Sequence, residues 1–297
     1  MLKTKFTLLL LFFTILLSAQ KASSFKFCDD FESENFINGY RNQEITKNNG
    51  YNFNFSSKKG RFNDGFLTVY LNETGRYGTP KRSEYGLRLY DSIGMKKFFQ
   101  ISVQITDGLK FDDVNFGREI MIMQWHSKPA PNRDWTHYRS NNPFNRPSIA
   151  LYLTTNDNLN FYLILRYGNN GKKDFKYSGE VWSVVALQRI DVNKWYDLTF
   201  EIKWSFQNDG YIASYINNEP FTPFNGLHNK VYGANMHNES PVYFKFGQYR
   251  YWDDKNVHKI HFDELRVGNS FDEVSLYDEY PCTFNENKSL NFIQNHK

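Results

Sequence analysis

Three short segments of the sequence combine side chains that can move a proton and hold an anion. The first contains Arg82 and Glu84, the second contains Gln124 and His126, and the third covers residues 243–251. An imidazole suits proton transfer near neutral pH, and an arginine held by a carboxylate is a preorganised partner for another carboxylate. These types favour acid–base chemistry on an anionic ligand. A surface ion pair and a structural histidine would use the same residues, so that alternative stays open.

Alternation along each segment decides which side chains share a face of a strand. Arg82 and Glu84 would share one face, and so would Gln124 and His126, which end a buried IMIM run and therefore need polar partners or a wet cleft. In the third segment one face carries Tyr243, Lys245, Gly247, Tyr249 and Tyr251. The opposite face carries Phe244, Phe246, Gln248 and Arg250, with the phenylalanines inward. The face with Tyr243, Lys245 and Tyr249 forms a polar, aromatic floor of the kind that sugars bind. A solvent-facing edge of the sandwich would show the same pattern.

The elements that must position these segments are strands. Short β-branched or aromatic runs separated by turn residues predict strands at residues 66–71, 99–105, 120–125, 149–154, 160–165, 195–204, 211–216, 242–246 and 260–267. Asp209-Gly210 predicts a hairpin, and Asn217-Asn218 closes the next strand. No helical stripe of twelve residues follows the N-terminus. The pattern predicts an all-β, two-sheet sandwich, with residues 129–147 as a long loop that is a candidate for function.

Composition narrows the class of protein. Aromatic residues make up 18% of the 297 residues and charged residues 23%, which excludes a disordered chain. The net charge is only +4 and no basic tail is present, so we expect no nucleic-acid partner. Two cysteines exclude a disulfide-scaffold miniprotein.

The N-terminus has the layout of a secretory signal. Lys3 and Lys5 precede an apolar run at residues 6–17, and the small residues Ser18 and Ala19 follow it. We predict a signal peptide at residues 1–19 and one domain at residues 20–297, secreted or periplasmic, with no membrane span after signal removal. Export permits a disulfide between Cys28 and Cys282, although their spacing alone does not fix one.

The three segments together resemble the jelly-roll polysaccharide lyases, in particular the group of heparin lyase I and glucuronan lyase, and also the alginate lyases of that fold. The matching motifs are Arg82-Ser83-Glu84, Gln124-Trp125-His126 and the run from Tyr243 to Tyr249, in that order. The resemblance spans residues 27–268. It departs at Tyr85-Gly86, where alginate lyases continue with an aliphatic residue and a second arginine. It implies a β-jelly-roll, a concanavalin-like two-sheet sandwich.

The implied reaction is β-elimination on a uronate-containing polysaccharide of the glucuronan, ulvan or heparin type, leaving an unsaturated uronate end. Gln124 and Arg82 would neutralise the uronate carboxylate, His126 would take the C5 proton, and Tyr249 would protonate the leaving O4, or perform both proton transfers. The expected substrate-binding residues are Glu84, Lys245, Tyr243, Tyr251, Arg146, Asn145 and His137. We expect no cofactor for the chemistry and a monomer.

The segment from Phe27 to Glu32, with Asp263, resembles the ends of lectin-like sandwiches that share a structural Ca²⁺, so Glu32 and Asp263 are its candidate ligands. Ordinary ion pairs would explain the same residues. Three alternative functions are a non-catalytic carbohydrate-binding sandwich, an alginate lyase, and a glycoside hydrolase of the same fold. The last needs a pair of flanking carboxylates that no strand supplies.

Overall fold

The computed structural model describes residues 27–32, 40–43, 53–62, 64–71, 81–128, 147–168, 183–224, 226, 228–236 and 241–276. Within these ranges the chain forms two antiparallel sheets, as the sequence predicted, with one short 3₁₀ helix (Asp113–Asn115) and one short helix, α2 (Phe271–Val274). No helix among the described residues is long and apolar enough to cross a membrane.

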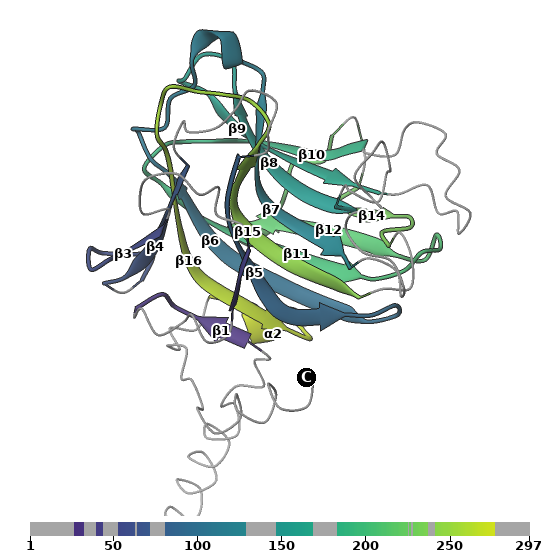
Figure 1. The fold of residues 1–297 in the computed structure, drawn as a ribbon. Coiled ribbons are helices and arrows are strands. Elements are labelled where there is room, and N and C mark those ends of the chain that lie inside the picture. Colours follow the sequence, from purple (N-terminus) through teal and green to yellow (C-terminus); the bar gives the residue numbers. More distant parts are fainter. Residues whose placement is uncertain are drawn as a thin grey trace, which may run out of the picture.

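The first sheet holds seven of the described strands, in the order β10-β9-β8-β7-β15-β5-β2. Their bounds are β10 (Ser183–Ile190), β9 (Phe161–Tyr167), β8 (Ile149–Thr155), β7 (Glu119–Ser127), β15 (Val242–Arg250), β5 (Lys81–Asp91) and β2 (Tyr40–Gln43). In Figure 1, β7, β15 and β5 run side by side through the middle of the molecule. All three segments with chemical side chains therefore lie on adjacent strands of one sheet.

The second sheet holds nine described strands and packs behind the first. Its main order is β13-β12-β11-β6-β16-β4-β3, with β1 paired to β16 and β14 paired to β12. The bounds are β13 (Glu219–Pro220), β12 (Tyr211–Ile216), β11 (Trp195–Lys203), β6 (Lys96–Ile105), β16 (His258–Gly268), β4 (Phe66–Leu71), β3 (Phe53–Ser56), β1 (Phe27–Asp29) and β14 (Lys230–Tyr232). Asn217 and Asn218 turn the chain from β12 to β13 with positive φ angles, as their types predicted.

An aromatic core joins the two sheets directly beneath the central strands. Trp125 of β7 is fully buried, and its ring lies 5.5 Å from Phe99 of β6, 5.1 Å from Phe200 of β11 and 4.9 Å from Phe244 of β15. Such pairs contribute about 0.5–1.5 kcal/mol each beyond the area that they bury. The inward side chains of β7 and β15 thus fix these strands to the second sheet, and their alternate side chains face outward.

Candidate active site

The strand β15 lies between β5 and β7, and this pairing gathers the predicted residues on one face of the seven-stranded sheet. Directly opposed residues of an antiparallel pair point to the same side. The opposed pairs are Arg82 with Tyr249, Glu84 with Gly247, Gln124 with Lys245, and His126 with Tyr243. We call the side of the sheet that carries these residues the site face.

The β15 strand contains a bulge at Gly247. The register with β7 shifts between Phe246 and Tyr249, and Gly247 has a φ of +134°, which favours glycine. A β-carbon there would clash with the carbonyl oxygen of Ser83 and lie 2.8 Å from the α-carbon of Glu84. The sequence did not predict this bulge, because register depends on the partner strand.

Gln124 and Glu84 meet across β15. The Nε2 atom of Gln124 donates a short hydrogen bond to Oε1 of Glu84, and both side chains are buried. Because a carboxylate only accepts, this bond fixes the amide with its nitrogen toward Glu84. A second N–H of the same nitrogen is left to serve another acceptor.

Arg82 contacts Tyr249, with its guanidinium 4.5 Å from the centre of the Tyr249 ring. The Oε1 atom of Glu84 accepts from Gln124, and the expectation that Glu84 holds Arg82 stays a prediction. Burial raises the pKa of the Tyr249 phenol well above its usual value, and its contact with Tyr251 acts in the same direction. The charge of Arg82 lowers that pKa but does not offset burial. Tyr249 is therefore held as a protonated phenol.

His126 is oriented by its own strand. Its Nδ1 atom lies 2.8 Å from the carbonyl oxygen of Ser127, and the ring is buried at 6.1 Å from the ring of Tyr243. A carbonyl only accepts, so in the neutral ring Nδ1 carries the proton and the lone pair is on Nε2. This is the tautomer that a general base needs if Nε2 faces the proton to be removed.

Lys245 lies beside the ring of Tyr243. Its Nζ atom is 5.3 Å from the ring centre of Tyr243, and its side chain is buried. The cation over the Tyr249 ring is Arg82. Lys245 and Gln124 instead form the middle of the site face.

Tyr251 lies beyond the end of β15, so the prediction that it continues the strand was wrong. Its side chain is 59% exposed, and its ring packs edge-on against Tyr249 with centroids 5.0 Å apart. Arg250 is buried and points away from the site face as predicted, and its Nη1 atom lies 2.7 Å from Nδ1 of His258.

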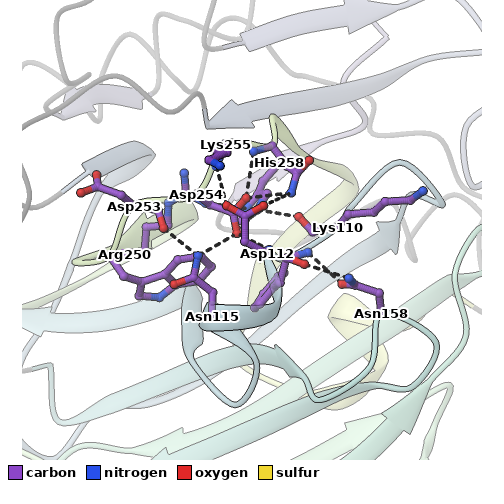
Figure 2. Close-up of polar contacts among 12 residues, drawn as sticks. Lys110, Asp112, Asn115, Asn158, Arg250, Asp253, Asp254, Lys255 and His258 are labelled. Atoms are coloured by element: carbon purple, nitrogen blue, oxygen red, sulfur yellow. Dashed lines mark hydrogen bonds and ion pairs between the residues drawn. The ribbon is translucent and has the colours of Figure 1, made fainter.

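The loop that follows Tyr251 is fixed by a buried carboxylate, Asp254 (Figure 2). Asp254 accepts hydrogen bonds from the backbone of Asp112 and Asn256 and from the side chain of Asn115, and it lies 3.6 Å from His258. Burial alone would raise the pKa of Asp254, but the bonds from His258 and the amides outweigh it and hold this pKa well below the usual range. The loop thus anchors the chain immediately after Tyr249.

An apolar floor continues the site face beyond Tyr249, and the sequence did not predict it. The buried residues Met121, Ala150 and Tyr152 pack with the half-buried Ile164 and Tyr249. A register shift between Met121 and Met123 places Met121 on the same face as Gln124 although the two residues are three apart. Strict alternation puts Met121 and Gln124 on opposite faces. The apolar floor could therefore not be predicted without knowing of the register shift in β7.

The two candidate calcium ligands interact electrostatically at the other sheet. Asp263 is buried and accepts hydrogen bonds from the backbone of Arg61 and Glu264, whereas Glu32 is exposed. Burial raises the pKa of Asp263 to about 9, and the charges of Glu264 and Glu32 act in the same direction. Crowded carboxylate oxygens suit a hard cation, which would offset this repulsion. Among the described residues, no group of three or more His, Cys, Asp or Glu side chains forms a ready metal site.

Several predicted features lie outside the described residues: the signal peptide, His137, Asn145, Arg146 and Cys282. Cys28 is buried in β1, which pairs with β16. The disulfide to Cys282 stays a prediction.

Solved structures similar to this chain include two kinds of lyase. An endo-β-1,4-glucuronan lyase from the fungus Trichoderma reesei superimposes with a TM-score of 0.59 at 15% identity, covering 84% of this chain and 98% of its own. Alginate lyase AlyC3 gives a TM-score of 0.42 at 16% identity, covering 68% of this chain and 74% of its own. Alginate lyase Aly36B gives 0.44 at 14% identity, covering 69% and 82%.

At these identities the glucuronan lyase supports the jelly-roll fold alone. No curated protein sequence matches this chain closely enough to count as a relative. The family model described as polysaccharide lyase matches residues 31–266, a span that includes every described residue of the site face. The chain therefore belongs to the polysaccharide lyase family.

Proposed function

We propose that this protein cleaves a uronate-containing polysaccharide by β-elimination. The C5–H and C4–O bonds break, a C4–C5 double bond forms, and the leaving O4 takes a proton. The observation that carries this proposal is the Gln124 amide, held by Glu84 and lying between His126 and Tyr249 along the strands. A donor flanked by one base and one acid is what elimination next to a carboxylate requires.

Neutralising the carboxylate is the first requirement, because the C5 proton is only weakly acidic while that carboxylate keeps its charge. The second N–H of Gln124 offers a donor to an incoming anion. Arg82, fixed over Tyr249, supplies a full positive charge at the same face. Donors that are fixed before the substrate arrives need no reorganisation during the reaction.

The two proton transfers then follow from the two titratable groups. His126, with its lone pair on Nε2, acts as the base for the C5 proton. Tyr249 is kept protonated by burial and acts as the acid for O4. Tyr249 could serve as the base only if its phenolate were stabilised, and the charge of Arg82 at its ring does not overcome burial.

The remaining residues are proposed to bind the chain on either side. Tyr243 and Lys245 would contact the sugar next to His126, while Tyr251 and the apolar floor would contact the sugar beyond Tyr249. His137, Asn145 and Arg146 are further proposed to bind the substrate. The glucuronan lyase of the same fold makes β-1,4-linked glucuronan the first substrate to test, followed by alginate, ulvan and heparin-type chains.

We also propose three properties that fit an exported enzyme. Residues 1–19 are cleaved as a signal peptide, Cys28 and Cys282 form a disulfide, and Asp263 and Glu32 hold a structural Ca²⁺. The ion would stabilise the fold and take no part in the chemistry.

The test uses the purified chain without residues 1–19 and the panel of uronate polysaccharides. Ultraviolet absorbance follows the new double bond, and a parallel assay follows new reducing ends. Absorbance that rises in proportion to the reducing ends on one polymer supports elimination. Binding to a polymer without either signal would favour a non-catalytic carbohydrate-binding sandwich instead.

A further inference from the structure

The second carboxylate oxygen of Glu84 is buried without a hydrogen-bond donor among the described residues. Glu84 is 2% exposed, and its Oε1 accepts from Gln124. Its Oε2 atom is buried and has no hydrogen-bond partner among the described residues. Buried acceptors in folded proteins nearly always have a donor, and leaving one without a partner is destabilising. A carboxylate kept in this state on the site face is suited to a donor that arrives with the ligand.

The surroundings of Glu84 define where that donor would be. Glu84 stands directly opposite Gly247, the residue of β15 that has no side chain and tolerates none. The hydrogen bond from Gln124 crosses β15 at this level. One oxygen of Glu84 thus has a protein donor, and the other is buried at the level of Gly247, close to the Gln124 amide that is proposed to hold the uronate carboxylate.

The negative charge of Glu84 determines which ligand group can bond to its Oε2 atom. A sugar hydroxyl can donate to Oε2, whereas a sulfate ester or an acetyl ester at the same position only accepts, and a sulfate adds a second negative charge. A site built to bond a hydroxyl strongly rejects an analogue that lacks one, because its own buried group then stays unpaired. The cations Arg82 and Lys245 lie over other rings, those of Tyr249 and Tyr243.

We propose that Glu84 Oε2 accepts a hydrogen bond from a free ring hydroxyl of the uronate bound over Gly247, and that Glu84 thereby selects unsulfated uronans against O-sulfated ones. This inference rests on the proposed β-elimination. It makes Glu84 a specificity-determining residue and places unsulfated polymers ahead of ulvan and heparin-type chains as substrates.

The experiment compares two forms of one polymer, the best-cleaved uronan and the same preparation after partial chemical O-sulfation. The ratio of kcat/KM values on the two forms is measured for the wild type, for Glu84→Gln and for Glu119→Gln. Glu119 is a matched control, because it is a glutamate on β7 of the same sheet but is paired with Arg166 at 2.6 Å. Melting temperatures check that each variant is folded.

The wild type and Glu119→Gln should prefer the unsulfated form by about 100-fold, and Glu84→Gln should reduce that preference at least about 10-fold, because a glutamine removes the charge and can donate. A preference that Glu84→Gln leaves unchanged, or a wild type that cleaves both forms equally, would overturn the inference while the elimination activity stands. If the wild type produced no unsaturated ends on any polymer, the proposed function itself would fail.

Discussion

The guanidinium of Arg82 lies 4.5 Å above the ring of Tyr249, and the two residues are directly opposed on β5 and β15. This contact connects the group proposed to neutralise the substrate carboxylate with the group proposed to protonate its leaving oxygen. Burial raises the pKa of Tyr249, while the charge of Arg82 lowers it. Because the charge of Arg82 affects the pKa of Tyr249, the pH dependence of activity in an Arg82 variant reports the role of Tyr249.

Replacing Arg82 by Gln should lower kcat/KM by about 100-fold, because one preorganised donor is lost. The same change should raise the pKa of Tyr249 further, since a lowering charge is removed. Tyr249 as the acid must be protonated, so the alkaline limb of the kcat/KM profile should not move to lower pH. The acidic limb reports the base, and it should stay in place. The exposed Arg118→Gln variant is the control. An acidic limb that moves to higher pH in Arg82→Gln would instead identify Tyr249 as the base.

Replacing Gly247 by Ala should lower the free energy of unfolding by about 2–3 kcal/mol, because the new β-carbon meets the backbone of Ser83 and the φ is positive. Gly94 provides a matched control. It also has a positive φ, of 81°, but a β-carbon added there would have no other atom within 4 Å, so Gly94→Ala should cost only about 1 kcal/mol. Denaturant unfolding of both variants checks this difference. Equal losses would show that the close contact at Gly247 is unimportant.

His261 should make the protein less stable in mild acid. Burial lowers the pKa of its ring to about 4, helped by the charges of Lys259 and Lys58. The unfolded chain, with a histidine pKa of about 6.5, binds this proton first. Stability should therefore fall as pH drops from 6.5 toward 4, by up to about 1.4 kcal/mol per pH unit. His261→Gln should flatten this part of the stability curve, and a curve identical to the wild type would contradict the assignment.

Calcium should raise the melting temperature of the protein, and a chelator should lower it. The expected reason is that a cation offsets the crowding of Asp263, Glu32 and Glu264. Asp263→Asn should abolish the calcium effect, whereas Asp272→Asn, which lies on the short helix α2, should retain it. Calorimetric titration with the metal alone gives an independent readout. A melting temperature that changes with neither calcium nor chelator would rule out the calcium site.

Alternation in the sequence predicted the sheets and most of the site face because it is a local property. The strands at residues 66–71 and 211–216 have the predicted bounds, and Gln124 and His126 share a face as expected. The strand β10 was missed, since a register shift between Val184 and Ala186 interrupts its pattern.

Features that depend on the partner strand were beyond reach of the sequence. The bulge at Gly247 and the hydrogen bond from Gln124 to Glu84 across β15 both depend on neighbouring strands. The same limit concealed the apolar floor, because a bulge in β7 places Met121 on the site face. A glycine inside an aromatic strand was the one local sign of the first bulge.

Elimination by His126 and Tyr249 is tested most directly by the mass of the products. Oligosaccharides released by the wild type should each carry one unsaturated end and lack the water that hydrolysis would add. His126→Ala and Tyr249→Phe should each lower that release by about 100-fold or more while polymer binding persists. Products that contain the added water, or full release by both variants, would contradict the account.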